Sequence, residues 1–530
     1  AELCGFAKTD VLAPGASETV NITVDKSELR TYDANNAKTY IVDAGDYYFT
    51  AATDAHNAVN NILAAKGYTV ENTDGRMTAD GNVALTYKWT NAALDSTTFA
   101  TSENGTAITN LFDEAEPNKS SSEPGEVTWL SRSNWVATFP TQPVVLNATQ
   151  TLADHLAFTR YDGSKADSVE MPTLGADNGL ALVSMIGADY DDPQWDTLLD
   201  QLTFNEMVNT ITLGFHNTAA IESIGKTRTK DENGPQGLTA ALTGGASAMC
   251  YTSEDVMAAT FNVDLINDVG RCIGEDCLAM GYSGLYGPGI NMHRTAYSGR
   301  NFEYYASDPF IAGTICAAEV NGIQSKGVYV YLKHVALNDS ESSRRGVNTW
   351  LNEQAAREIY LEVADKAVTD GGAWSVMTGF NRWGAYWCGA YDNLLTGFLR
   401  GELGMRGMII TDYSGSSKYM DLADGLIAGS DIWDSPDPTI HTTLAPKYEN
   451  DAYIVTEMRE SMHKILYTVA NSNAMNGWSS ADRLKVITPW WKTALYALDT
   501  VLAVLTVLCI WRLVVAIKRK KTWTAEQAAN

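Results

Sequence analysis

Three short apolar runs, each followed by polar residues, constrain the fold of this chain more than any other feature. They cover residues 327–332, 373–377 and 408–410. Short, nearly continuous apolar runs are typical of parallel strands buried on both faces. Helical patterns lie between them, over residues 352–368 and 392–399. The alternation extends over about 280 residues and predicts an α/β fold with a parallel sheet.

Two architectures share this local signature. A (β/α)8-like barrel and an open doubly wound sheet both alternate strands with helices, and periodicity alone does not choose between them. The preceding part of the chain differs. Residues 1–70 alternate apolar and polar positions between turn residues, as at Val20, Ile22 and Val24. This pattern predicts a β-sandwich, and residues 71–190 are interpreted as an irregular linker region.

Charge and cysteine content narrow the class of protein. The chain carries 64 acidic and 38 basic residues, a net charge of −26. This balance argues against nucleic acid as a partner, which requires a basic face, and it fits an extracytoplasmic body. The 7 cysteines are scattered without a C-x-x-C pair, so we expect neither a disulfide framework nor a zinc site. The start at Ala1, without Met or a signal peptide, indicates a processed or truncated product.

The C-terminal end has a different character. Residues 493–517 are mostly apolar, and Asp499 and Arg512 interrupt them only near the ends. A bilayer-spanning helix needs about 20 such residues. The basic run at residues 518–521 follows directly. By the positive-inside rule, the sequence predicts a single-pass helix in the cell membrane, with residues 518–530 cytoplasmic and the body outside. The alternative is an amphipathic helix packed on the body.

The residues that follow the apolar runs include charged and aromatic side chains. Lys333 and His334 follow the first run, and Asp412 and Tyr413 follow the third, while Arg300 precedes the first. The carboxyl ends of parallel strands meet at one edge, where barrels place their active sites. An unpaired charge at the inner end of a strand is costly. A carboxylate, cations and aromatic rings together favour a sugar-binding pocket.

Each of these residues also has an ordinary structural interpretation. An Asp after a strand, such as Asp412, is typical of turns and helix N-caps. Arg300 fits a structural salt bridge, and Arg345 fits a solvated loop charge. For Glu303 and Glu341, structural roles are the favoured interpretation. The residue types alone therefore leave these alternatives open.

Six ordered stretches of the chain resemble glycoside hydrolase family 3, in its β-glucosidase-like branch. The stretches are GPGINMHR (287–294), SGRNFEYY (298–305), KHVALNDSESSR (333–344), NEQAAREIYL (352–361), LLTGFLRGELGMRGMIITDY (394–413) and AGSDIWD (428–434). The first 70 residues resemble the fibronectin-III-like domain of the family, which precedes the barrel in domain-permuted members. The resemblance implies a (β/α)8-like catalytic barrel over residues 191–475, preceded by a fibronectin-III-like β-sandwich.

The family resemblance also implies a chemistry, the retaining hydrolysis of terminal β-glycosides. In that reaction one carboxylate attacks the anomeric carbon and a second carboxyl group, about 5–5.5 Å away, protonates the leaving oxygen. Carried over by motif, Asp412 is the nucleophile. Arg300, Lys333 and His334 would bind hydroxyl groups of the sugar in the −1 subsite, and Arg344 would line the same region.

Three further residues complete the implied substrate-binding set: Asn233, Met377 and Tyr413. The implied substrate is a β-linked oligosaccharide or glucoside. No metal and no organic cofactor is implied. Members of the family with a loop His as proton donor carry a glycine-containing sequence after Lys-His, and that sequence is absent here.

The chain departs from the family pattern at three points. Asn233 stands where the family usually has Asp, and Phe380 stands where it often has Tyr. The third point is the acid/base Glu, which β-glucosidase-like members take from an α/β sandwich domain; no stretch here matches that domain. We therefore expect a membrane-anchored extracytoplasmic enzyme whose acid/base comes from outside this chain, from a separate α/β sandwich domain or chain. The alternative is a membrane-tethered carbohydrate-binding protein with degraded catalysis.

Overall fold

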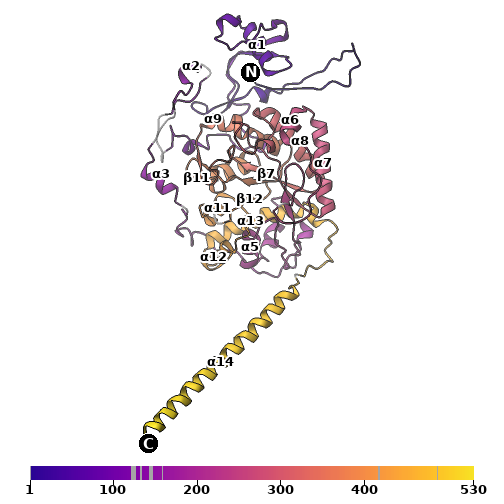
Figure 1. Ribbon diagram of the computed structural model, residues 1–530. Helices are drawn as coiled ribbons and strands as arrows, with labels where there is room; N and C mark the ends of the chain where they lie inside the picture. The colour runs from indigo at the N-terminus through magenta and orange to yellow at the C-terminus, as the bar shows by residue number, and fades with distance from the viewer. Residues whose placement is uncertain are drawn as a thin grey trace. The chain divides into compact units, whose positions relative to one another are not determined.

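Figure 1 shows the computed structural model of the chain, which describes residues 2–120, 127–131, 134–142, 147–157, 159–240, 242–415, 418–485 and 487–529. The chain divides into two compact units, Ala1–Asp482 and Arg483–Asn530. The first unit holds the strands and the α/β core. The second unit is dominated by one long helix.

A five-stranded parallel sheet forms the centre of the first unit. Its strands are β5 (Asp231–Asn233), β6 (Gly284–Tyr286), β7 (Tyr329–Val335), β9 (Ser375–Thr378) and β12 (Ile409–Thr411). They lie side by side in the order in which they occur along the chain. All pairs are parallel. The three apolar runs are thus confirmed as β7, β9 and β12.

The strand order decides between the two architectures that the sequence leaves open. A doubly wound sheet reverses its strand order at a switch point, whereas this sheet continues in one direction. Beyond β12 the ladder extends to one more segment, through a parallel bridge between Ile410 and Ile432. The structure therefore shows the winding of a barrel over these segments. Closure by eight strands stays a prediction.

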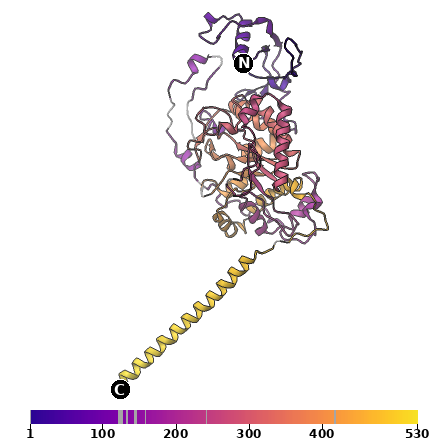
Figure 2. The same ribbon diagram turned by 45° about the vertical axis from the view of Figure 1, so that its right-hand side comes forward.

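Helices precede, separate and follow the strands of this sheet along the chain. The longer ones are α5 (Phe204–Thr212), α7 (Val263–Met280), α8 (Pro309–Gln324), α10 (Glu362–Thr369), α12 (Pro438–Tyr448) and α13 (Ala452–Ala470). Figures 1 and 2 both show α7 and α8 lying side by side along one flank. The capping box predicted from Thr203 and Glu206 is present at the start of α5. Short helices connect these elements: α4 (Gln194–Leu199), α6 (Glu254–Ala259), α9 (Glu353–Ala355) and α11 (Leu422–Ala428).

Both helices predicted between the strands form, and each includes wider, π-helical turns. Residues 352–368 become α9 and α10, joined by a wider turn at Ala356–Tyr360. Residues 392–399 become part of a wide helix over Asn393–Glu402. A three-stranded sheet of two-residue strands lies nearby, built from β8 (Asn348–Thr349), β10 (Arg382–Trp383) and β11 (Tyr386–Trp387).

The N-terminal part differs from the predicted sandwich. Its strands form two separate antiparallel pairs, β1 (Thr31–Asp33) with β2 (Thr39–Ile41), and β3 (Gly45–Thr50) with β4 (Thr86–Asn91). A helix, α1 (Ala55–Ala65), lies between β3 and β4 in the sequence. The β3–β4 pair crosses the predicted boundary at residue 70. Within the predicted linker, residues 71–190, the structure also has α2 (Trp135–Thr138) and α3 (Gln150–His155).

One strand prediction in this region is wrong. Residues 16–25 form no strand, although Val20, Ile22 and Val24 alternate with polar residues. The side chains of Val20 and Ile22 are 39% and 48% exposed. Because no second layer covers these side chains, the alternating pattern has no apolar surface against which to pack.

The second unit contains α14 (Trp490–Ala529), drawn in Figure 1 as one continuous helix. Its stretch Trp490–Ala525 is long and apolar enough to cross a bilayer, with mean hydropathy 2.5 in its most apolar window. The predicted span at residues 493–517 lies inside this stretch.

Candidate active site

The carboxyl end of β7 places a lysine and a histidine inside the core. Lys333 and His334 are both buried. The Lys333 ammonium group lies 3.4 Å from a carboxylate oxygen of Glu303 and 3.5 Å from the carbonyl oxygen of Gly234. Burial lowers the pKa of Lys333, while Glu303 opposes that effect. The paired carboxylate offsets part of the cost of holding this charge away from water.

His334 is held in one orientation by Asn291 and Arg300. Asn291 Oδ1 accepts the His334 backbone N–H at 2.9 Å and lies 3.1 Å from Nδ1. Arg300 Nη1 donates to Nε2 at 3.1 Å. Burial and the neighbouring cations hold the pKa of His334 well below its usual range. The ring is therefore neutral, with its proton on Nδ1 facing Asn291.

Asp412 follows β12 directly and faces His334. The side chain is buried; its Oδ1 accepts the backbone N–H of Tyr413 at 2.7 Å. Its Oδ2 lies 3.5 Å from His334 Nε2. Since Nε2 accepts a hydrogen bond from Arg300, it carries no proton to donate to Asp412. Oδ2 has no hydrogen-bond partner among the described residues. One carboxylate oxygen of Asp412 is thus buried with its hydrogen-bonding capacity unused by the described residues.

Arg300 links His334 to a supporting pair of acids. Its guanidinium group donates to both carboxylate oxygens of Glu303, each at 2.7 Å, and its Nη1 lies 3.6 Å from Glu341. Such two-point pairs fix the plane of the guanidinium group. The salt-bridge interpretation of Arg300 is therefore correct for one edge of the group, while the other edge faces His334.

Burial is the main influence on the titration of Asp412. It raises the pKa of this carboxyl, and the Tyr413 N–H and the charges of Arg300, Arg344 and Lys333 oppose it. A nucleophile must be ionised. The cations that surround the carboxylate therefore favour the reactive form against the effect of burial.

The other predicted residues lie at differing distances from this centre. Arg344 pairs with Glu341 at 3.0 Å and covers the ring of Phe380. Met377 is buried in β9, in register with Lys333. Tyr413 is 36% exposed. Asn233 turns toward its neighbour, because its amide donates to Glu232 Oε1 at 3.2 Å. Among the described residues, its side chain makes no hydrogen bond to Asp412.

Sequence reasoning missed Asn291, whereas the structural role that it favoured for Glu303 agrees with the ion pairs of that residue. Asn291 and Glu303 hold His334, Arg300 and Lys333 in place, yet they lie in separate loops. Both occur inside the matched stretches 287–294 and 298–305. Their position within these motifs could therefore have indicated that they belong to the site.

Replacing Arg344 with Gln should move the acid limb of the kcat/KM profile to higher pH. The charge of Arg344 lowers the pKa of Asp412. Without it the carboxylate accepts a proton at a higher pH, and activity that depends on the ionised form is lost sooner as pH falls. Rates measured from pH 4 to 8 with one substrate give the shift.

Arg345→Gln is the matched control. Arg345 also covers the Phe380 ring, at 5.2 Å, but its side chain is exposed. Water therefore screens its charge, and its profile should stay near that of the unmodified protein. An equal shift in both variants would argue against a specific effect of Arg344 on Asp412.

Comparison with known proteins locates this site within a family. Residues 215–440 match the model for the glycosyl hydrolase family 3 N-terminal domain, and this segment includes β5 to β12 and Asp412. This part of the chain belongs to glycosyl hydrolase family 3. Residues 1–55 match a fibronectin type III-like domain.

Several relatives that match this segment are named as β-glucosidases. A β-glucosidase of Rhizobium radiobacter is 34% identical over 240 residues, 45% of this chain and 29% of the relative. β-Glucosidase A of Butyrivibrio fibrisolvens is 27% identical over 449 residues, 81% of this chain and 49% of the relative. The chain thus spans half or less of the length of these curated relatives.

A solved structure shows the same fold over most of the chain. A β-glucosidase from Paenibacillus barengoltzii superposes with a TM-score of 0.64, covering 92% of this chain and 51% of that one. The two sequences are 21% identical, so this likeness concerns the fold alone.

Proposed function

We propose that this chain carries out retaining hydrolysis of terminal β-glucosides, with Asp412 as the nucleophile. The observation that carries the proposal is the buried Oδ2 of Asp412, which has no hydrogen-bond partner among the described residues. It lies at the end of a parallel strand among Arg300, Lys333 and His334. The family 3 relatives named as β-glucosidases support the substrate class. Residues Asn233, Met377, Arg344 and Tyr413 are proposed to line the sugar pocket around this centre.

The proposed reaction has two displacements. The Asp412 carboxylate forms a bond to the anomeric carbon while the bond to the leaving oxygen breaks and that oxygen gains a proton. Water then attacks the same carbon, gives a proton to the group that protonated the leaving oxygen, and the bond from the carbon to Asp412 breaks. The buried cations bind hydroxyl groups of the sugar and keep Asp412 ionised.

The proton donor is proposed to come from outside this chain, from an α/β sandwich domain or a separate polypeptide. Loss of general acid catalysis costs roughly 10²–10⁴-fold in rate. Aryl glucosides with a good leaving group need little protonation, so they should be turned over by this chain alone. Natural β-linked oligosaccharides should depend on the added donor.

Covalent labelling tests the proposal. A 2-fluoro glucoside with an activated leaving group should inactivate the protein. The mass of the protein should increase by that of one sugar per chain, and peptide mapping should place the sugar on Asp412. Unlabelled protein, or a label on another residue, would contradict the assignment of the nucleophile.

A second candidate function is a carbohydrate-binding protein without turnover. Asn233 faces Glu232 rather than the pocket centre, and Phe380 lacks the phenolic group that the family often has there. Sugar binding without turnover of even an activated aryl glucoside would favour this candidate. Turnover that is lost in Asp412→Asn would exclude it.

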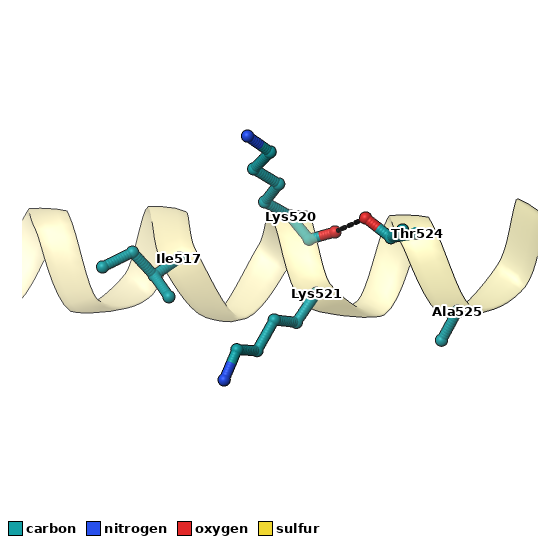
Figure 3. Close-up of a pocket in the computed structure, with 5 residues that line it drawn as sticks. All are labelled: Ile517, Lys520, Lys521, Thr524 and Ala525. Carbon is teal, nitrogen blue, oxygen red and sulfur yellow. Dashed lines mark hydrogen bonds between the residues drawn. The ribbon is translucent and has the colours of Figure 1, made fainter.

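We also propose that α14 anchors the protein in the cell membrane, with the tail in the cytoplasm and the α/β body outside. The helix is about 60 Å long, against about 30 Å for a bilayer core. Figure 3 shows Lys520 and Lys521 pointing to opposite sides of the helix, next to Ile517. Basic side chains that extend around the helix suit a ring of anionic headgroups.

We assign no ligand to the hollow drawn in Figure 3. It is lined by Ile517, Lys520, Lys521, Thr524 and Ala525, all on one helix. The hydroxyl group of Thr524 donates to the Lys520 carbonyl within the same helix. We therefore interpret this surface as part of the membrane boundary.

Introducing Leu505→Arg together with Leu508→Arg should release the protein from membranes. Each charge near the middle of the span costs roughly 2.5–3.5 kcal/mol. The unmodified chain should stay with the pellet after alkaline carbonate washing, whereas the double variant should move to the supernatant. Thr524→Arg adds a charge beyond the predicted span at residues 493–517 and should stay in the pellet; release of all three proteins would contradict the anchor.

A further inference from the structure

A second carboxyl group, that of Asp434, lies beside the proposed nucleophile. The segment that carries it runs parallel to β12, because Thr411 N–H donates to Ile432 O at 3.0 Å. Asp434 N–H then donates to Thr411 Oγ1 at 3.1 Å, and Ser414 N–H donates to Asp434 O at 3.0 Å. Neighbouring parallel strands lie about 4.8 Å apart. Asp412 and Asp434, each two residues beyond the bridged pair, are therefore neighbours.

The surroundings place the Asp434 carboxyl on the buried side of the site. The side chain is buried, and its Oδ1 accepts the Tyr286 hydroxyl at a long 3.4 Å. The Tyr286 ring is itself buried and packs edge-on against Tyr331, 5.2 Å between centroids. On the other side, His216 pairs with Glu232 at 3.0 Å. Aromatic core groups thus back this carboxyl.

The electrostatics of Asp434 leave it able to bind a hydroxyl group. Burial raises its pKa to about 7, with Asp412 adding to the rise and His216 opposing it. Hydrogen bonds from the His216 backbone N–H and the Tyr286 hydroxyl also lower the pKa of Asp434. A carboxylate has about four lone-pair sites, so these two donors leave it acceptor capacity. A ligand hydroxyl can both donate to a carboxylate and accept from a carboxylic acid, so it fits either protonation state.

The geometry also relates Asp434 to the departure at position 233. Asn233 is in register with Tyr286 in the β5–β6 pair. The Asn233 amide turns to Glu232, while the Tyr286 hydroxyl reaches Asp434. A carboxyl group is therefore present near the position where the family usually has Asp, but it comes from a different segment.

We propose that Asp434 binds a hydroxyl group of the terminal sugar on the side away from the scissile bond, at C4 or C6. The leaving group of a bound glycoside has to extend toward solvent, so the buried side of the site, where Asp434 lies, meets the opposite side of the ring. Asp434 is then a specificity-determining residue that favours sugars with a free hydroxyl group there. The inference rests on the proposed function only in that a terminal β-linked sugar occupies the pocket.

Matched substrates test this assignment. Aryl β-glucoside and its 4-deoxy and 6-deoxy analogues, all with one leaving group, are compared in the unmodified protein and in Asp434→Ala. We expect kcat/KM for the glucoside to fall about 10- to 100-fold, as for loss of a hydrogen bond to a charged group. For the analogue that lacks the bound hydroxyl group, the same substitution should change kcat/KM less than about 3-fold. For the glucoside, kcat/KM of Asp434→Asn should lie between those of the unmodified protein and Asp434→Ala, because an amide is a weaker hydrogen-bond acceptor than a carboxylate.

Asp437→Ala is the matched control, three residues further along. Asp437 caps α12 and makes its side-chain hydrogen bonds to Thr439, so the ratio between glucoside and deoxy analogues should not change. An equal loss on all three substrates in Asp434→Ala would show a purely structural role. A loss that grows with leaving-group basicity and is recovered by azide would show a proton donor; either result overturns the proposal.

Binding separates a failure of this inference from a failure of the proposed function. Calorimetry with glucose, 4-deoxyglucose and 6-deoxyglucose needs no turnover. If Asp412 is not labelled but Asp434→Ala weakens glucose binding and leaves one deoxy sugar unaffected, the proposed chemistry fails while the Asp434 assignment stands. If Asp412 is labelled and Asp434→Ala weakens the binding of all three sugars equally, the proposed chemistry stands while the Asp434 assignment fails.

Discussion

Replacing Asp412 with Asn should lower kcat for an activated aryl β-glucoside by roughly 10⁴–10⁶-fold, the range seen when a covalent nucleophile is removed. The amide keeps the shape of the side chain and can still accept the Tyr413 N–H. It cannot form the glycosyl ester on which the double displacement depends. Steady-state rates and labelling by the 2-fluoro glucoside should be lost together.

The control for this substitution has to be another Asp→Asn change in the same part of the chain. Asp437→Asn retains a side chain that caps α12, since Asn serves well as an N-cap, and it should keep full activity. Glucose binding to Asp412→Asn should persist, because Arg300, Lys333 and His334 remain. Turnover by Asp412→Asn within tenfold of the unmodified rate would rule out Asp412 as the nucleophile.

Replacing Arg357 with Met should destabilise the first unit by about 3–5 kcal/mol, the cost of breaking a buried ion pair. The guanidinium group donates to Glu353 at 2.8 Å and to both carboxylate oxygens of Glu402, at 2.6 and 2.9 Å. It also donates to the carbonyl oxygen of Thr109. The substitution leaves two carboxyl groups buried without their cation.

The structural reach of this network explains the size of the expected effect. Glu353 also accepts the backbone N–H groups of Leu111 and Phe112, at 3.0 and 2.6 Å. Arg357 and Glu353 therefore fasten residues 109–112 to the helices around the sheet. Burial raises the pKa of Glu353 and Glu402, with Arg357 opposing it.

The measurement is the midpoint of urea unfolding, with Arg271→Met as the control. Arg271 pairs with Asp268 at the surface, with the two side chains 54% and 67% exposed, and such pairs contribute about 0–1 kcal/mol. With Arg357 gone, the folded pKa of both acids rises further, so the deficit should grow as pH rises through those values and shrink in acid. Equal midpoints for Arg357→Met and Arg271→Met would contradict this role.

The local pattern of the sequence determined the parts of the fold whose physics is local. The three apolar runs became β7, β9 and β12, because a strand buried on both faces needs apolar residues at every position. Lys333, His334 and Asp412 then had to meet, since parallel strands end at a common edge. The apolar character of α14 was equally readable, because it depends only on composition over about 20 residues.

Other features were decided only by tertiary structure. The alternation at Val20 and Ile22 predicted a strand, but no layer covers these side chains. The choice of a barrel-like winding over a doubly wound sheet came from the strand order, which periodicity does not encode. The support of His334 by Asn291, and the approach of Asp434 to Asp412, join segments that are distant in sequence. Such contacts exist only once the sheet has wound and brought its loops to one edge, so no local pattern could have shown them.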